Sequence, residues 1–188
     1  MIAVFDDMTL VTDAEVQRML PLVNGQRREA ALRYKHRFGR FACLKSWLML
    51  EELVRPLGVN DMEFAFNIHG KPRLKQRPDI HFNLSHCKNG IAAAIDGAPV
   101  GIDIESFRPM SEALIRKTMN VREIACCQAA PAPEQAFIAL WTQKEAVLKL
   151  RGTGISTNLH QVLDGIGYRL ETHINEEKHY AWSVAYTA

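Results

Sequence analysis

Three strand-like segments follow one another at residues 80–86, 91–95 and 100–105. Apolar and polar residues alternate in the first of them, which is typical of a strand with one buried face. The segments are separated by Asn89-Gly90 and Asp96-Gly97, two dipeptides that favour tight chain reversals. A meander of this kind needs an apolar layer to cover its buried face, so strands and helices are expected in one α+β fold.

The order of these strands predicts which side chains meet. If neighbours pair in sequence, the first and third strands run parallel, and Ser85 and His86 lie at the same end of the sheet as Asp103 and Glu105. Alternation places both acids on one face, about 7 Å apart at the backbone, so their carboxylates can converge on one cation. Oxygen ligands favour Mg²⁺, whereas a solvated strand face is the alternative interpretation.

Helical patterns lie on both sides of the meander. Helices are expected at about residues 13–22, 27–57, 111–127 and 134–150, with interruptions near Phe38-Gly39 and Asn120. Strand composition returns at residues 63–67, 167–174 and 180–186. Both halves therefore read as helices followed by strands. We expect two similar α+β lobes, residues 1–97 and 98–188, each with helices packed on a small antiparallel sheet.

The expected helix at residues 134–150 contributes a third carboxylate. Phe137, Leu140, Trp141 and Leu148 form an apolar stripe, while Glu145 and Lys149 lie one turn apart on another face. Glu145 and Lys149 can be a surface ion pair worth a few tenths of a kcal/mol, or they can belong to a site. The latter interpretation gains weight from Asp103 and Glu105.

Composition and charge exclude several classes of protein. Residues 27–45 hold seven arginines and lysines against one acid, but the net charge of the chain is only +2. A local anion site is therefore favoured over a broad nucleic-acid surface. No apolar run approaches eighteen residues, which argues against a membrane span. The acidic N-terminal segment does not resemble a signal peptide, and four cysteines without metal-ligand spacing suggest reduced thiols, so a cytoplasmic protein is expected.

The motifs together resemble a known family. The order Gly-Lys-Pro, Phe-Asn-Leu-Ser-His, Gly-Ile-Asp-Ile-Glu and Trp-x-x-Lys-Glu-Ala-x-x-Lys, within residues 27–154, is similar to that of the surfactin-type (Sfp-type) 4'-phosphopantetheinyl transferases. The resemblance implies a pseudo-dimeric monomer with its active site in the cleft between two lobes. It also implies transfer of phosphopantetheine from coenzyme A to a carrier-protein serine, with release of adenosine 3',5'-bisphosphate.

By the same resemblance, Asp103, Glu105 and Glu145 would hold Mg²⁺ against the pyrophosphate. The implied catalytic residues are Glu145, Lys149 and His86, with Glu145 taking the serine proton directly or through a water. The implied ligands of coenzyme A are Arg33, Arg40, Lys71, Pro72, Ser85, His86, Lys144 and Lys149. The expected substrates are acidic carrier proteins of fatty-acid, polyketide or nonribosomal-peptide synthesis.

One motif departs from the family pattern. A Phe-Ser-x-x-Glu element is replaced here by Met119-Asn-Val-Arg-Glu123, a departure that bears on carrier docking more than on catalysis. Arg116, Lys117, Arg122 and the apolar Met119 are candidate docking residues. The alternatives are a coenzyme A or carrier-binding protein without turnover, and an unrelated metal-dependent phosphoesterase or nucleic-acid enzyme. The latter would need a broad basic surface.

Overall fold

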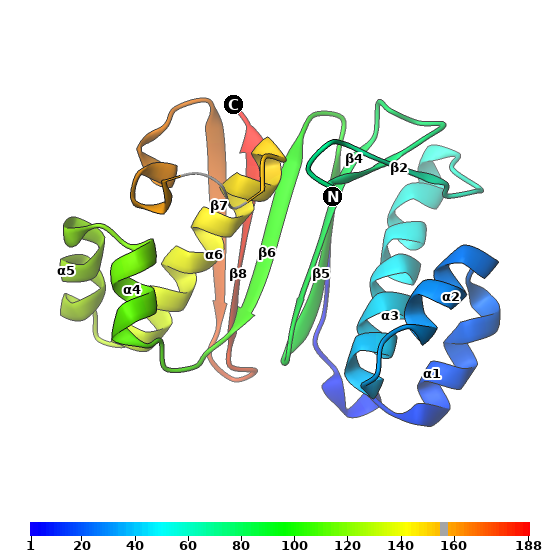
Figure 1. Ribbon diagram of the computed structural model, residues 1–188, viewed down its shortest axis with the longest axis horizontal. Helices are drawn as coiled ribbons and strands as arrows, with labels where there is room; N and C mark the ends of the chain where they lie inside the picture. The colour runs from blue at the N-terminus through cyan, green and yellow to red at the C-terminus, as the bar shows by residue number, and fades with distance from the viewer. Residues whose placement is uncertain (155–157) are drawn as a thin grey trace.

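The computed structural model describes residues 1–154 and 158–188, in which two antiparallel sheets lie between two layers of helices (Figure 1). The α-helices are α1 (Asp13–Met19), α2 (Gly25–Leu32), α3 (Arg37–Val54), α4 (Glu112–Thr118), α5 (Val121–Ala129) and α6 (Pro133–Arg151). The strands are β1 (Ile2–Phe5), β2 (Phe64–Phe66), β3 (Pro72–Leu74), β4 (His81–Cys87), β5 (Gly90–Asp96), β6 (Val100–Ser106), β7 (Tyr168–Asn175) and β8 (Tyr180–Thr187). This architecture confirms the predicted α+β class.

The two larger sheets each contain three strands, in the orders β1-β5-β4 and β6-β8-β7. The Asn89-Gly90 turn joins β4 to β5 in an antiparallel pair, as predicted. The predicted pairing of β5 with β6 is wrong, because β6 pairs with β8, some eighty residues later in the chain. The strand β1, which the sequence patterns did not predict, takes the free edge of β5.

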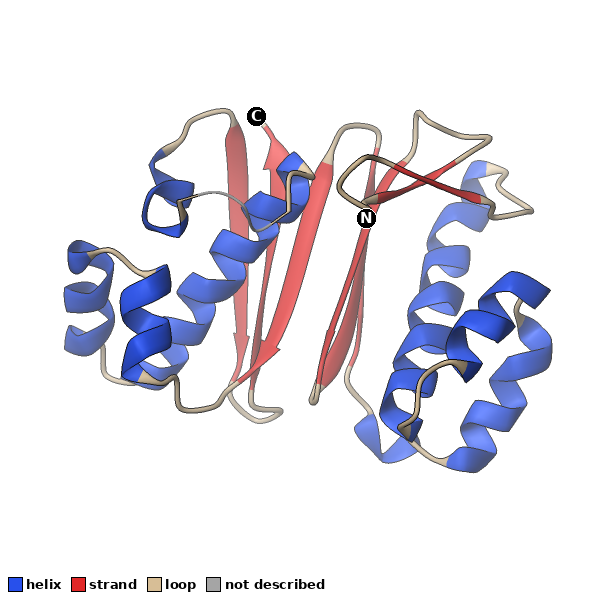
Figure 2. Ribbon diagram, in the orientation of Figure 1, coloured by secondary structure: helices blue, strands red, loops and turns tan. Residues whose placement is uncertain are grey.

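Each of the two larger sheets packs against another layer on both of its faces. Helix α3 covers one face of the first sheet, where Phe41, Leu44 and Leu50 share a core with Phe82 and Ile91. The opposite face meets the second sheet in a further apolar cluster of small and β-branched side chains (Ala92, Ala94, Val100, Ile102, Ile104 and Val184). Helix α6 covers the outer face of the second sheet (Figure 2). The helices thus lie outside and the sheets inside.

The adjoining strands β4 and β6 are joined by side chains. Asn83 Oδ1 accepts from the Ile102 amide at 2.8 Å, and Ser85 Oγ lies 3.4 Å from the Ile104 amide. The earlier residue of β4 contacts the earlier residue of β6, and the later residue contacts the later one. The two strands therefore run parallel. Buried polar groups require partners, and these two side chains satisfy amides that a neighbouring strand would otherwise bind. The predicted proximity of Ser85 to Asp103 of β6 is therefore confirmed. It arises from side-chain contacts between β4 and β6 and not from a continuous sheet through β5.

The long helix expected at residues 27–57 is divided earlier than predicted. Helix α2 ends at Leu32 and α3 begins at Arg37, so the break lies before Phe38-Gly39. Gly39 is inside α3, where a Cβ atom would lie 2.6 Å from Tyr34 Cδ1. The glycine therefore makes room for the Tyr34 ring and does not interrupt the helix.

The remaining helix boundaries follow local capping signals. Asn120 caps α5 and separates it from α4, as predicted. Pro133 begins α6, and Gly152, with a positive φ of 66°, ends it in the left-handed conformation that glycine adopts without strain. Among the described residues, no helix is both long enough and apolar enough to cross a membrane. All four cysteines are free thiols, and three of them are buried.

Candidate active site

The site forms where β4, β6 and α6 meet. Asp103 of β6 is only 4% exposed, and its Oδ1 atom accepts from Lys149 Nζ at 2.6 Å and from Ser85 Oγ at 2.8 Å. Lys149 Nζ also donates to Ser85 Oγ at 2.9 Å. Three of the predicted residues therefore make one hydrogen-bonded group, although they come from elements separated by 18 to 64 positions in sequence.

Glu145 lies one turn before Lys149 on α6 and faces the same space. Burial, followed by the negative charge of Asp103, raises the pKa of Glu145 to about 6, while Lys149 acts in the opposite direction. The pKa of Glu105 is also raised, first by burial and then by Asp103. Arg108 and Lys149 act on Glu105 in the opposite direction. The burial of three crowded carboxyl groups makes a site that favours additional positive charge.

Two adjoining cavities share Glu145 and Lys149 in their walls. One, of about 390 Å³, is lined by Leu84, Ser85, His86, Asp103, Glu105, Trp141, Glu145 and Lys149. The other cavity, of about 280 Å³, is lined mainly by the loop before β3, which contains Lys71, and by the end of α6. Pro72 of β3 and Asn83 of β4 complete its wall. The predicted acids thus face a space that can admit a ligand. Asn83 was missed as a site residue, although its alternation with Ser85 in β4 was the available signal.

His86 lies in the wall of the larger cavity. Its ring meets that of Phe38 edge-on at a centroid distance of 5.8 Å, which joins the start of α3 to the site. Partial burial, and then the charge of Lys149, lower the pKa of His86. The imidazole keeps access to solvent, so it can change protonation when an anion binds.

Lys144 lies away from both cavities, which corrects its expected role as a ligand of coenzyme A. Its side chain is fully buried, and Nζ donates to Glu123 Oε2 and to the Leu159 carbonyl, both at 2.7 Å, and to the Thr118 carbonyl at 2.9 Å. A buried ammonium must be paired in this way because desolvation is costly. Lys144 therefore anchors α6 to α4, α5 and η4 (Leu159–Asp164).

The other basic candidates differ in placement. Lys71 and Pro72 line the smaller cavity, but Lys71 Nζ donates to three backbone carbonyls. Arg33 is exposed near the end of α2, and Arg40 donates to the Tyr34 carbonyl at 2.9 Å. Neither arginine lines the two cavities. The structure therefore places Ser85, His86 and Lys149 around the larger cavity and Pro72 in the adjoining smaller one, and it leaves Arg33 and Arg40 outside both.

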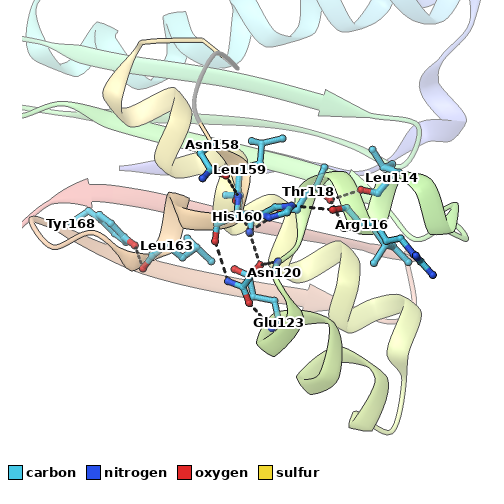
Figure 3. Close-up of polar contacts among 12 residues, drawn as sticks. Leu114, Arg116, Thr118, Asn120, Glu123, Asn158, Leu159, His160, Leu163 and Tyr168 are labelled. Carbon is cyan, nitrogen blue, oxygen red and sulfur yellow. Dashed lines mark hydrogen bonds and ion pairs between the residues drawn. The ribbon is translucent and has the colours of Figure 1, made fainter.

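The segment that departs from the family pattern has a structural function. Asn120 and Glu123 form a reciprocal capping box at the start of α5, and Asn120 Nδ2 also donates to the His160 carbonyl at 3.0 Å (Figure 3). Asparagine serves as an N-cap about as well as serine does.

Met119 is 1% exposed, so the expectation that it contacts a carrier is wrong. The other candidate docking residues, Arg116, Lys117 and Arg122, are exposed.

Two buried oxygen atoms fit a metal ion at this site. Among the described residues, no group of three or more His, Cys, Asp or Glu side chains is already gathered closely enough to hold one. Asp103 Oδ2 and Glu145 Oε1 are nevertheless buried without a hydrogen-bond partner in the described part of the chain. Mg²⁺ commonly takes only one or two carboxylates and completes its shell with waters and phosphate oxygens. The donor set suits that ion.

Comparison with known proteins identifies the family of the chain. Residues 99–186 match the family model of the 4'-phosphopantetheinyl transferase superfamily. The chain is 33% identical over 150 residues to 4'-phosphopantetheinyl transferase psf-1 of Bacillus pumilus, covering 77% of this chain and 64% of that protein. It is 29% identical over 154 residues to Sfp of Bacillus subtilis strain 168, covering 79% and 69%. A further Bacillus subtilis 4'-phosphopantetheinyl transferase is 30% identical over 150 residues, covering 77% and 67%.

Buried acids, a lysine and a histidine around a cavity are suited to a phosphate-handling protein. The matched segments span about two thirds of the length of these relatives. The residues that match the family model include β6 and α6 of the site. The chain belongs to the 4'-phosphopantetheinyl transferase superfamily.

Proposed function

We propose that this chain transfers 4'-phosphopantetheine from coenzyme A to a serine hydroxyl of an acyl or peptidyl carrier protein. The observation that supports this most strongly is the grouping of Asp103, Glu145 and Lys149 around one cavity in a member of this family. In the reaction, the serine oxygen forms a bond to the β-phosphorus of the pyrophosphate. The bond from that phosphorus to the bridging oxygen breaks, and adenosine 3',5'-bisphosphate leaves.

Glu145 accepts the serine proton, directly or through a water. In the metal-free protein its pKa of about 6 leaves it mostly ionised near neutral pH and makes it more basic than an ordinary carboxylate. Lys149 offsets the negative charge that grows on the leaving phosphate, and His86 donates to a pyrophosphate oxygen. Ser85 forms hydrogen bonds with both Asp103 and Lys149 and so fixes the positions of these two side chains.

Asp103, Glu105 and Glu145 would hold Mg²⁺, with the two unpartnered oxygens among its ligands. When bound there, the ion supplies positive charge that polarises the pyrophosphate. The present contact of Lys149 with Asp103 balances part of the same acidic charge.

Addition of Mg²⁺ is therefore expected to raise the thermal unfolding midpoint of the free protein by a few degrees. A ligand that binds only the folded state stabilises it by RT ln(1 + L/Kd), which increases with the ligand concentration L. Differential scanning fluorimetry at increasing Mg²⁺ measures the effect. Asp103→Asn should remove most of it, whereas the remote exposed acid Glu176 can be changed to Gln as a control; an equal rise in Asp103→Asn would exclude this metal site.

His86→Ala is expected to weaken coenzyme A binding about tenfold, which corresponds to the loss of one charge-assisted hydrogen bond. A bound phosphate raises the pKa of His86 from its lowered value, so affinity should increase as pH falls. Calorimetric titrations at about pH 7.5 and about pH 5.5 measure both effects. The control His173→Ala should retain affinity, and an unchanged affinity in His86→Ala contradicts the assigned contact.

The same proposal treats residues 1–97 and 98–188 as the two lobes of a pseudo-dimer with the site between them. Both sides of the site come from one chain, which supports action as a monomer. The exposed Arg116, Lys117 and Arg122 suit an acidic carrier, and four free thiols are compatible with a reducing cytoplasm. A binding protein without turnover is disfavoured by the complete set of acids and Lys149.

The proposal is tested by incubating an apo carrier protein with this chain, coenzyme A and Mg²⁺, and measuring its intact mass. A gain equal to one phosphopantetheine group is expected. Binding of coenzyme A without any gain across several carriers would favour the non-catalytic alternative.

A further inference from the structure

The tight turn between β2 and β3 reaches across to the end of α6. Within the turn, Asn67 Oδ1 accepts from the amides of His69 at 2.9 Å and Lys71 at 2.8 Å. Asn67 Nδ2 donates outward to the Gly152 carbonyl at 3.1 Å, across 85 positions of sequence. The amide side chain thus fixes the shape of the turn and its attachment to α6 at the same time.

Lys71 makes the second attachment. Its Nζ atom lies 2.6 Å from the Lys149 carbonyl, 3.3 Å from the Leu150 carbonyl and 3.1 Å from the Val100 carbonyl. An ammonium has three donors, and this one has three acceptors, so its hydrogen-bonding capacity is filled. Burial lowers the pKa of Lys71 to about 8, which keeps the group largely protonated at neutral pH.

These contacts satisfy groups that a helix end always exposes. The last four carbonyls of an α-helix have no partner within the helix, and their partial negative charge favours a cation nearby. Lys71 supplies that cation from the turn between β2 and β3, and it also reaches the carbonyl of Val100, the first residue of β6. The ammonium therefore joins the end of α6 to the strand that bears Asp103.

We infer that Asn67 and Lys71 are positioning residues that clamp the C-terminal turn of α6 and thereby hold Lys149 against Asp103. The catalytic part of this inference rests on the proposed function, whereas the clamp itself does not. It replaces the expectation that the Lys71 ammonium binds coenzyme A directly, since a phosphate would have to compete with three carbonyls. The loop can still shape the smaller cavity through its backbone and Pro72.

The clamp is tested first by hydrogen exchange, which requires no turnover. In Lys71→Met, we expect backbone amides of residues 149–152 to exchange at least about fivefold faster than in the wild type. Lys75→Met is the matched control, because Lys75 is exposed and pairs with Glu63 at the surface of the same hairpin. Unchanged exchange at the end of α6 in Lys71→Met would overturn the clamp. If this variant does not fold, Asn67→Ala provides the same comparison.

Kinetics then separate positioning from ligand binding. Loss of the clamp should lower kcat at least about tenfold while changing the KM for coenzyme A by less than about threefold. A direct phosphate contact would instead raise KM, weaken coenzyme A binding and leave exchange of α6 unchanged, and this result would contradict the inference. If the wild type transfers nothing, the proposed function fails, but the exchange experiment still decides the clamp.

Discussion

Glu145→Gln is expected to lower the rate of phosphopantetheine transfer by about 10³-fold. The amide has nearly the same shape but cannot accept the serine proton, and loss of a general base commonly costs 10² to 10⁴ in rate. It also replaces one of the carboxylates proposed to hold Mg²⁺. Since both functions reside in the same group, the effect should appear mainly in kcat.

The rate is measured by the appearance of holo-carrier protein. Glu134→Gln is a matched control, because Glu134 is an exposed acid in the first turn of the same helix. That control should transfer at the wild-type rate. If Glu145→Gln retained more than about a tenth of the activity, Glu145 would not have the proposed role.

The same substitution should not destabilise the free protein. The folded pKa of Glu145, about 6, lies above its ordinary value of 4.5, so the folded state favours the protonated form. The contribution of Glu145 to the free energy of unfolding is greatest below about pH 4.5, where the group is protonated in both states. This contribution is lost as the pH rises through about 6. Near neutral pH, Glu145→Gln should therefore be as stable as the wild type or more stable by about 1 kcal/mol, a value reduced for solvent screening.

Gly101→Ala should destabilise the fold by about 3 kcal/mol and reduce transfer as well. A Cβ atom at this position would overlap the Ala146 carbonyl and the Leu150 amide nitrogen and would lie 2.9 Å from Leu150 Cα. These are backbone atoms of α6, which cannot rotate away as a side chain can. The added methyl group must therefore push α6 from β6, and overpacking of this kind is costly.

Urea unfolding measures the loss, and Gly97→Ala is its control. A Cβ atom added to Gly97, in the turn before the same strand, meets no atom within 4 Å. The control should remain within about 0.5 kcal/mol of the wild type. An equally small change in Gly101→Ala would show that α6 does not depend on this close approach.

Local patterns in the sequence predicted most elements because their signals are local. The Asn89-Gly90 turn, the Asn120 cap and the Gly152 helix end each depend on a few neighbouring residues. Sheet partners do not, and the choice of β8 over β5 as the neighbour of β6 depends on packing between distant segments. Asn83 and Ser85 compensate for that choice by binding the amides of β6.

The same distinction applies to the lysines of the site. Lys144 and Lys149 lie on one helix within one motif, and the sequence alone does not separate their functions. Packing does so, because Lys144 is buried against the Glu123 cap whereas Lys149 faces Asp103. The family resemblance assigned Lys71 to coenzyme A, and no pattern in the sequence indicates its contacts with the carbonyls of α6. Long-range contacts therefore account for both differences.

Intact-mass spectrometry of an apo carrier protein tests the central claim most directly, when wild type and Asp103→Asn are compared with coenzyme A and Mg²⁺. The account predicts one added phosphopantetheine group with the wild type and almost none with Asp103→Asn over the same time. Equal modification by the two proteins would contradict the proposed site, and no modification by the wild type with any carrier would contradict the proposed activity.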